Sequence, residues 1–262
     1  SGALTRAAIF DLAGGATGQD TGMRILIVGD SHAGPLKRGW ERLRADGGLH
    51  GGVSITVHPV GAAHKLVLPF WQPAGDHARI TNPRFRRRLS RIPPSGPRPD
   101  AIGLSMPFWS GRVVRKMGQQ DLSLHGIGGP GRLVSDAVFR QMVLADQQEI
   151  LALADYLLSL DLRLFVVAPP GYFRDFSDLP RLGPLRLLRL DAAYRAVMRA
   201  ELAQRAVPVV DVPEACFDRQ GFMLSAFRNE DPADTHHGNS DFGALMIGEI
   251  ERWAVARALS KS

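Results

Sequence analysis

Short apolar runs alternate with longer segments of helical periodicity along this chain. Five runs have the length and composition of buried strands: residues 23–28, 53–57, 100–105, 162–170 and 207–213. Strands that are separated by helices pair in parallel through right-handed crossovers, and helices then cover both faces of the sheet. The pattern therefore predicts an α/β fold: a three-layer α/β/α sandwich with a mostly parallel sheet of about five strands.

Four segments carry apolar residues at helical spacing: residues 35–45, 136–160, 186–206 and 242–259. Ser135 immediately precedes the second of them and is a candidate N-cap. Two remaining stretches, residues 61–99 and 106–133, show no clear periodicity, and we expect them to be irregular. The second of these is a glycine-rich loop, long enough to carry function.

Length and composition predict one principal domain. With 262 residues, 45% of them hydrophobic, the chain can bury a sizeable core as a single unit. We expect residues 23–262 to form this domain and residues 1–22 to be an N-terminal extension. Cys216 is the only cysteine, which excludes an internal disulfide and a thiolate metal cluster.

Charge and hydropathy bear on partners and location. The net charge of +6 comes mainly from arginines, and arginines spread over the surface are the commonest reason for such a value. No apolar run approaches the roughly 20 residues that a membrane helix needs. Residues 1–22 lack the basic start and hydrophobic stretch of a signal peptide, so we expect a cytoplasmic protein, with an already removed leader as the alternative. The sequence gives no indication of oligomeric state.

The first apolar run ends in a motif whose side chains could take part in a reaction, "ILIVGDSHAG" at residues 25–34. Ser31 lies directly after a predicted strand and before a predicted helix, where parallel sheets bind their ligands. Its backbone N–H lies at the first turn of the helix, where the helix dipole favours negative charge. Ser31 is therefore a candidate nucleophile. The alternative is that Asp30 or Ser31 only caps the helix.

A second motif, "EDPADTHHGNSDFG" at residues 230–243, joins the last strand region to the final helix. Asp234 and His237 are three residues apart, a spacing that lets one turn offer a carboxylate to the near nitrogen of an imidazole. A serine nucleophile needs such a base, and the base needs such an acceptor to fix its tautomer. Ser31, His237 and Asp234 would supply all three parts of a catalytic triad.

Three other interpretations of the second motif stay open. The segment could be a polar turn in which Asn239 or Ser240 caps the helix. His236 is a rival base, although the three-residue spacing favours His237. Asp234, His236 and His237 are also ligand types that suit zinc. A metal site would leave the first motif unexplained, so we expect no metal and no cofactor.

Together, "GDSH" after the first strand and "D-x-x-H" before the last helix resemble the SGNH (GDSL-type) hydrolase superfamily, whose fold is a flavodoxin-like α/β/α sandwich. The form "GDSHA", residues 29–33, is especially similar to SGNH domains fused to bacterial membrane acyltransferases that modify polysaccharides. The resemblance implies an esterase or acyl-transfer site with Ser31 as nucleophile, His237 as base and Asp234 as its partner.

The resemblance also implies oxyanion donors, which this sequence matches in part. Besides the N–H of Ser31, the family uses a glycine after the second strand, and "HPVGAAH" offers Gly61 there. The family's asparagine after the third strand is missing from "LSMPFWSGR", residues 104–112. Loss of one oxyanion donor can cost on the order of 100-fold in rate. The side chains closest to the vacant position, together with the neighbour of the nucleophile, are our candidate substrate-binding residues: Trp109, Ser110, Arg112 and His32.

Two further clusters bear on the substrate. The run "RFRRRLSR", residues 84–91, is the densest positive stretch and is typical of a solvated face or of a patch that attracts an anionic polymer. Phe85 is its one aromatic residue, so we expect no nucleic-acid partner. Aromatic residues in the loops that should flank Ser31 favour a carbohydrate ester, because sugar rings pack on flat apolar faces. These residues are Phe70, Trp71, Phe108 and Trp109.

The sequence thus predicts a serine esterase that cleaves short, acetyl-like acyl esters on a saccharide or another small molecule. Two alternatives remain. If a sugar hydroxyl outcompetes water at the acyl-enzyme stage, the same residues form a polysaccharide O-acyltransferase. The missing asparagine favours instead a non-catalytic SGNH-like module that binds glycans or a protein partner.

Overall fold

Five parallel strands form the central sheet of the computed structural model, which describes residues 22–47, 52–127 and 131–259. In chain order they are β1 (Met23–Gly29), β2 (Val53–Pro59), β6 (Ala101–Ser105), β9 (Leu164–Val167) and β10 (Val209–Val210). Their spatial order is β10-β9-β6-β1-β2, and each pair is parallel. This is the 2-1-3-4-5 order of flavodoxin-like folds. The predicted α/β/α class is confirmed, and all but one residue of the predicted extension, residues 1–22, lies outside the described residues.

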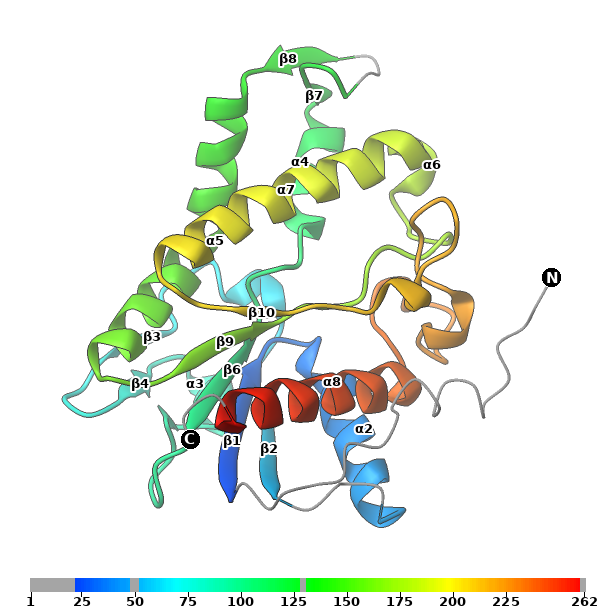
Figure 1. Ribbon diagram of the computed structural model, residues 1–262. Coiled ribbons are helices and arrows are strands. Elements are labelled where there is room, and N and C mark those ends of the chain that lie inside the picture. The colour runs from blue at the N-terminus through cyan, green and yellow to red at the C-terminus, as the bar shows by residue number, and fades with distance from the viewer. Residues whose placement is uncertain (1–21, 48–51, 128–130, 260–262) are drawn as a thin grey trace.

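Helices cover both faces of the sheet (Figure 1). One face carries α2 (Ala33–Ala45) and α8 (Ser240–Leu259), and the other carries α4 (Gly111–Gln119), α5 (Asp136–Ser159) and α7 (Pro184–Gln204). Successive residues of a strand point to opposite faces. Accordingly, Ile25 and Ile27 pack in the core with α2 and α8, while Leu26 and Val28 pack in the other core. The apolar run that predicted a strand is therefore a strand buried on both faces.

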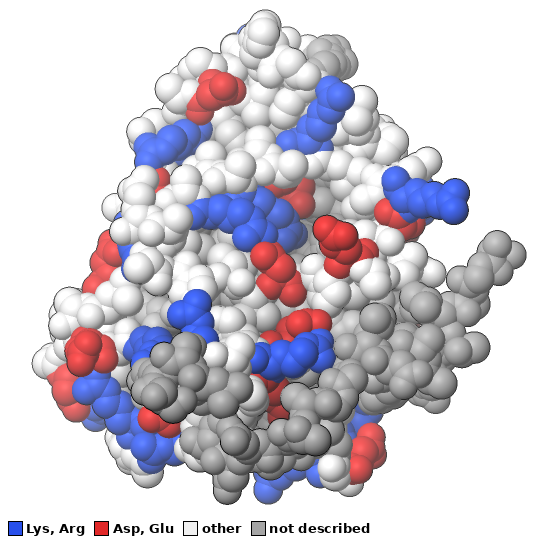
Figure 2. Space-filling model, viewed as in Figure 1, with Lys and Arg blue, Asp and Glu red and all other residues white. Residues whose placement is uncertain are grey.

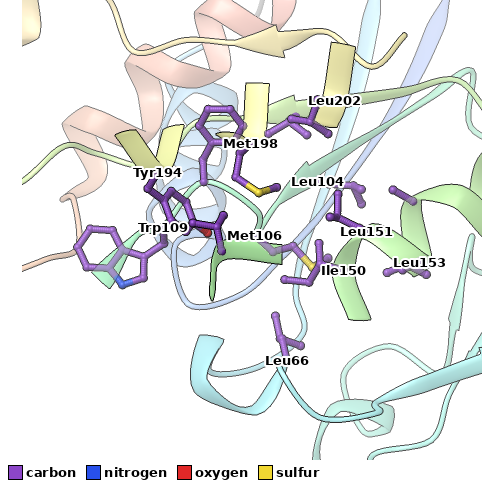
Figure 3. Packing of buried hydrophobic residues seen from close by; sticks show 14 of the residues in the cluster. Leu66, Leu104, Met106, Trp109, Ile150, Leu151, Leu153, Tyr194, Met198 and Leu202 are labelled. Atoms are coloured by element: carbon purple, nitrogen blue, oxygen red, sulfur yellow. The ribbon is translucent and has the colours of Figure 1, made fainter. Parts of the chain in front are cut away.

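The larger hydrophobic core lies between the sheet and the α5–α7 layer. Figure 3 shows Leu104 of β6, Ile150 of α5 and Met198 of α7 lying close together in it. Trp109 belongs to the same cluster, at the end toward which β6 runs. The core therefore extends to the carboxyl end of the sheet, where the sequence places its functional motifs.

The two stretches that we predicted to be irregular contain regular elements. Residues 61–99 hold a three-stranded antiparallel sheet and a helical turn: β3 (Trp71–Pro73), β4 (Ala78–Ile80), α3 (Pro83–Arg86) and β5 (Arg91–Ile92). Residues 106–133 hold most of another group: α4, β7 (Leu122–Leu124) and β8 (Arg132–Val134). The prediction was wrong here because strands of two or three residues are too short to show a period.

Short helices complete the described chain: α6 (Leu179–Leu182), η1 (Ala63–Lys65), η2 (Glu214–Cys216) and η3 (Ser225–Phe227). The predicted N-cap of α5 is confirmed, since the Ser135 hydroxyl accepts a hydrogen bond from the N–H of Val138 at 3.3 Å. Asn239, one of the two predicted caps of α8, accepts a hydrogen bond from the N–H of Phe242 at 3.0 Å. Within the described residues, no helix combines the length and the hydropathy that crossing a membrane requires.

The helices α2 and α8 cross in direct backbone contact at two glycines. A Cβ added to Gly39 would lie 2.1 Å from the backbone nitrogen of Ala244, and one added to Gly243 would lie 1.9 Å from the backbone oxygen of Pro35. An ion pair between Arg42 and Asp241 lies beside the crossing. Because α2 begins just after Ser31 and α8 just after residue 237, this contact brings the two sequence motifs to the same end of the sheet.

We predict that Gly39→Ala lowers the free energy of unfolding by about 2 kcal/mol or more, because its methyl group meets backbone that cannot rotate away. Urea-induced unfolding would measure the loss. Gly34→Ala is the matched control on the same helix, since its Cβ would meet only the end of the Arg38 side chain at 3.5 Å. We expect that control to be neutral or stabilising by up to about 1 kcal/mol. Equal stability of the two variants would contradict the close crossing.

Candidate active site

Ser31 lies between the end of β1 and the start of α2, at the point where the order of the sheet reverses. The register places Gly29 of β1 opposite Ser105 of β6, and a Cβ on Gly29 would lie 2.5 Å from the Ser105 backbone oxygen. Because Gly29 has no side chain, the backbones of β1 and β6 can approach as closely as this turn requires. The Ser31 N–H donates no hydrogen bond to the described part of the chain. It is therefore available to an anion at a helix N-terminus, where the helix dipole adds to the attraction.

The second motif pairs the two side chains that its spacing selected. The Nδ1 atom of His237 lies 2.8 Å from Oδ2 of Asp234 and 3.0 Å from Oδ1. The backbone N–H groups of His237 and His236 donate to Asp234 Oδ1 at 3.1 and 3.3 Å. Partial burial opposes ionisation of Asp234, but these hydrogen bonds and the His237 ring outweigh it and lower the pKa of the carboxyl below its usual value. Asp234 is thus an ionised acceptor that fixes the His237 ring.

Asn229 is a site residue that our sequence analysis missed. Its Nδ2 donates to Asp234 Oδ2 at 2.9 Å, and its Oδ1 accepts from the N–H of Asp231 at 3.0 Å. Its own backbone N–H donates to the carbonyl oxygen of His237 at 3.0 Å. Asn229 therefore holds both members of the carboxylate–imidazole pair. The available signal was its place one residue before the motif that we selected, as one of only three asparagines in the chain.

The two motifs, about two hundred residues apart, meet through a cluster of aromatic rings. The His32 ring lies 4.6 Å from that of His237 and 5.9 Å from that of His236, centroid to centroid. Trp109 completes the cluster, 4.8 Å from His32 and stacked on His236 at 5.4 Å. The neighbour of Ser31 is thus in contact with the predicted base. The Nε2 atom of His237 is buried without a hydrogen-bond partner, so no such bond joins it to the Ser31 hydroxyl in this structure.

Two histidines of this cluster are neutral at neutral pH. Burial, followed by the charges of His237 and His236, lowers the pKa of His32 well below its usual value. Burial, followed by the charge of His237, lowers the pKa of His236 to about 4. Both ring nitrogens of His32 lack hydrogen-bond partners among the described residues. His32 and His236 therefore surround His237 with uncharged rings.

Asp30, between β1 and Ser31, is fully buried. Its Oδ1 accepts a hydrogen bond from the N–H of His32 at 2.8 Å, while Oδ2 has no partner. Burial raises the pKa of Asp30 to about 7, against the opposing effects of this hydrogen bond and of Arg112. Asp30 thus carries a proton over most of the acidic range, although it directly precedes the proposed nucleophile.

The three side chains that we placed near the missing asparagine have different surroundings. Trp109 is 6% exposed and borders the histidines. Arg112 forms a two-point ion pair with Asp146 at 2.7 and 2.8 Å. Ser110 is wholly buried, and its hydroxyl lies 2.6 Å from Asp191 Oδ1 and 2.8 Å from the Tyr172 hydroxyl. Ser110 is therefore part of a buried network in this structure and not open to a substrate.

Gly61 lies beside the end of β1, the strand that precedes Ser31. The N–H of the preceding Val60 donates to the carbonyl oxygen of Gly29 at 2.7 Å, which ties this turn to the end of β1. A Cβ on Gly61 would lie 1.8 Å from the ring of Phe85, so only glycine fits. The Gly61 N–H donates to no acceptor in the described residues. It is thus a second free donor close to Ser31.

The predicted aromatic residues are mostly structural. Phe70 and Phe108 are completely buried. Trp71 stacks on Tyr156 at 5.4 Å and donates its indole N–H to the backbone oxygen of Glu149 at 3.1 Å. Of the four aromatics selected from the sequence, Trp109 is the one in contact with the histidine cluster.

The ligand atoms of Asp234, His236 and His237 lie within 4.8 Å of one another, so this group could also hold a metal ion. In this structure, however, the Asp234 oxygens are bonded to the His237 ring, to two backbone N–H groups and to Asn229. These bonds fix a carboxylate–imidazole pair, which is the arrangement that activation of a serine requires.

Comparison with known proteins gives structural likeness only. No protein-family model and no curated protein matches the sequence. A GDSL-like lipase from Bacteroides thetaiotaomicron is 10% identical, with 97% of each chain covered and a TM-score of 0.47. An acetyl xylan esterase is 12% identical, covering 89% of this chain and all of that one, with a TM-score of 0.44.

The periplasmic domain of a lipopolysaccharide acetyltransferase from Salmonella ser. Paratyphi A is 12% identical, with 96% of this chain and 89% of that chain covered and a TM-score of 0.39. The chain is thus similar over most of its length to the solved structures of a GDSL-like lipase, an acetyl xylan esterase and an acetyltransferase domain. Because all three TM-scores are below 0.5, these likenesses carry no conclusion about its chemistry.

We predict that Asp30→Asn raises the free energy of unfolding at pH 8 but not at pH 4. Near pH 4, Asp30 is largely protonated in the folded protein and about half protonated in the unfolded chain. Its titration therefore changes the free energy of unfolding of the wild type little at this pH. As the pH rises toward 7, the unfolded chain releases this proton while the folded protein keeps it. Asp30 then lowers the free energy of unfolding by up to about 4 kcal/mol, since its pKa differs by about three units.

Urea unfolding of both proteins at the two pH values measures this difference. The depressed pKa values of His32 and His236 act in the opposite direction, because they reduce stability as the pH falls below about 6.5. That effect is common to wild type and variant, so it cancels in the subtraction. A difference between the two proteins that does not change with pH would show that Asp30 titrates normally.

Proposed function

We propose that this protein is a serine esterase of the SGNH type, with Ser31, His237 and Asp234 as its catalytic triad. The observation that carries the proposal is the convergence of the two motifs: the His237–Asp234 pair lies against the residue next to Ser31, with the far nitrogen of His237 unpartnered. A base whose near nitrogen is bound and whose far nitrogen is free is poised to accept a hydroxyl proton.

The reaction follows from these positions. The Ser31 oxygen attacks the ester carbonyl while His237 Nε2 takes the hydroxyl proton, and Asp234 stabilises the imidazolium. The N–H groups of Ser31 and Gly61 donate to the oxyanion. The C–O bond to the alcohol then breaks, and His237 returns its proton to the departing oxygen. Water, deprotonated by His237, hydrolyses the acyl-serine and releases the acid.

The uncharged surroundings of His237 favour this role. A second positive charge close by would make protonation of His237 more difficult, and His32 and His236 remain neutral because they are buried. Ser110 is engaged in its network, and Arg112 pairs with Asp146 through Nε and Nη2 while its buried Nη1 has no partner among the described residues and is an alternative donor. We assign the place of the missing asparagine to Trp109, because it borders the histidines. Its indole N–H would supply the third hydrogen bond to the oxyanion.

The substrate that we propose is a short acyl ester, acetyl-like, on a carbohydrate. The support is the similarity of the "GDSHA" form to SGNH domains that modify polysaccharides, together with the aromatic face of Trp109 at the site. Transfer of the acyl group to a sugar hydroxyl uses the same residues. Incubation with an acetyl donor ester and an oligosaccharide separates the two outcomes, because transfer yields acetylated sugar as the main product.

A non-catalytic binding module is the second candidate. It is favoured by one observation: no hydrogen bond joins His237 Nε2 to Ser31 in this structure. Catalytic hydrogen bonds are often long before substrate binds, so this geometry alone does not decide between the candidates.

We predict that a fluorophosphonate probe labels the wild-type protein and that Ser31→Ala abolishes the labelling. With p-nitrophenyl acetate as substrate, Ser31→Ala should lower kcat/KM by about 1,000-fold or more, because the nucleophile is lost. Ser54→Ala, an exposed serine of β2, is the matched control and should behave as wild type. A folded wild-type protein that is not labelled would favour the binding module.

We also predict that Asn229→Ala lowers kcat about tenfold or more and changes KM little. The variant removes a hydrogen bond to Asp234, so the His237 ring is less firmly held, while the substrate's own contacts remain. Steady-state kinetics with p-nitrophenyl acetate give both constants. Asn82→Ala, which removes the cap of α3, tests whether any loss of a loop asparagine has the same effect. An unchanged kcat for Asn229→Ala would show that Asp234 needs no such support.

A further inference from the structure

The arginine run of residues 84–88 has no part in the triad, and its charges are unpaired. Arg84, Arg86, Arg87 and Arg88 are all exposed, and none of them forms an ion pair with an acidic group in the described residues. Phe85, in the middle of the run, is buried and packs against Gly61. The run is therefore anchored at the proposed oxyanion glycine, with its guanidinium groups directed away from that anchor.

A groove lies next to this run. It has a volume of about 520 Å³ and is lined by Lys37 and Trp40 of α2, by Thr56, Val57, His58 and Pro59 of β2, and by Arg88. Lys37 and Arg88 are cationic, and none of the described residues that line the groove is acidic, although Lys37 also lies 3.7 Å from Glu41 on its own helix. We call the groove together with Arg84, Arg86 and Arg87 the basic groove.

Many of the other arginines in the described residues are paired with acids. Arg195 and Arg199 of α7 form ion pairs with aspartates. Figure 2 shows the same pattern on the face that it presents, where red side chains lie beside blue ones. Four unpaired guanidinium groups within five residues form a dense local cluster of positive charge, and such a surface attracts anions.

The basic groove lies close to Ser31. Pro59, on its wall, is opposite Gly29 in the register of β1 and β2. Lys37 is six residues after Ser31, which is about 9 Å along the axis of α2. A chain molecule that lies in the groove could thus extend to the nucleophile without leaving the surface.

We propose that the basic groove binds a polysaccharide of carboxylated sugars and presents an ester on one of its residues to Ser31. This inference rests on the proposed esterase function and adds the substrate class: an acidic, not a neutral, glycan. Carboxylates match exposed guanidinium groups in two-point hydrogen bonds.

A nucleic acid is the competing polyanion, and the structure gives it less support. Bases bind through exposed aromatic rings that alternate with positive charges. In this run the aromatic residue is Phe85, which is 2% exposed, and the guanidinium group of Arg44 lies 5.5 Å over the ring of Trp40. The basic groove thus has charge but little stacking surface.

The test compares Arg86→Gln/Arg88→Gln with the wild type in binding and in catalysis. Calorimetry with oligogalacturonate gives Kd, and kinetics with acetylated oligogalacturonate and acetylated cello-oligosaccharide of equal length give KM. We expect the variant to weaken Kd, and to raise KM for the acidic ester, about tenfold, as the loss of two exposed ion pairs implies. Neither KM for the neutral ester nor kcat/KM for p-nitrophenyl acetate should change.

Arg132→Gln/Arg181→Gln is the matched control, because it removes the same charge from exposed positions in β8 and α6, which lie near the top of Figure 1, away from α3. The control should bind oligogalacturonate as the wild type does. Exposed charges are screened by salt, and the Debye length is about 10 Å at 0.1 M ionic strength. The wild-type preference for the acidic ester should therefore shrink as the ionic strength rises above about 0.1 M.

Three results would overturn the inference. These are equal binding by the groove variant and wild type, no wild-type preference for the acidic over the neutral ester, and tighter binding of a single-stranded DNA of equal charge. In each case, continued cleavage of p-nitrophenyl acetate would leave the esterase proposal intact. Failure to cleave any ester would instead refute the proposed function, and calorimetry would still decide whether the basic groove binds the acidic glycan.

Discussion

The backbone contact between α2 and α8 is the constraint on which the rest of the site depends. Gly39 and Gly243 let the two helices approach more closely than any side chain would allow. Since α2 starts after Ser31 and α8 starts after His237, their crossing fixes how the beginning and the end of the chain meet. This close backbone contact makes the relative position of the two motifs a property of the core, which is rigid because it is closely packed.

The site that results is unusually apolar for a group of ionisable residues. Asp30, His32 and His236 are each shifted toward their neutral form, and burial is the largest cause in all three. Burial of polar groups without partners costs free energy, and the crossing of the helices and the surrounding core must offset that cost. In contrast, the pKa of the Asp234 carboxyl, which is bonded to the proposed base, is lowered, and this suits the proposed esterase.

Features that depend on residues close together in the sequence could be predicted, whereas features that depend on contacts between distant residues could not. The fold class, the position of Ser31 between a strand and a helix and the pairing of Asp234 with His237 depend on local patterns of strand, turn and helix, and they could be predicted. The α4 helix and the β3–β4–β5 sheet could not, because short elements are stabilised by contacts with distant residues more than by their own pattern. Our expectation for Ser110 failed for the same reason: its partners Tyr172 and Asp191 are more than sixty residues away.

Asn229 is a residue of the proposed site that could not be found from the sequence. Its side chain holds Asp234 and its backbone holds His237, yet neither hydrogen bond has a signature in the sequence, since an asparagine in a polar turn has many uses. The ring contacts of Trp109 with His32 and His236 are likewise tertiary. The residues that carry out the proposed chemistry could thus be predicted from the sequence, whereas those that orient them needed the structure.

The most direct measurement of the central claim is a crystal structure of the protein after reaction with a fluorophosphonate. We predict a covalent bond from the Ser31 oxygen to phosphorus and a phosphonyl oxygen within hydrogen-bond distance of the N–H groups of Ser31 and Gly61. His237 Nε2 should lie within direct reach of the Ser31 oxygen, with Asp234 still bound to its other ring nitrogen. A phosphonyl group on another residue, or a His237 ring farther than one water molecule from Ser31, would contradict the account.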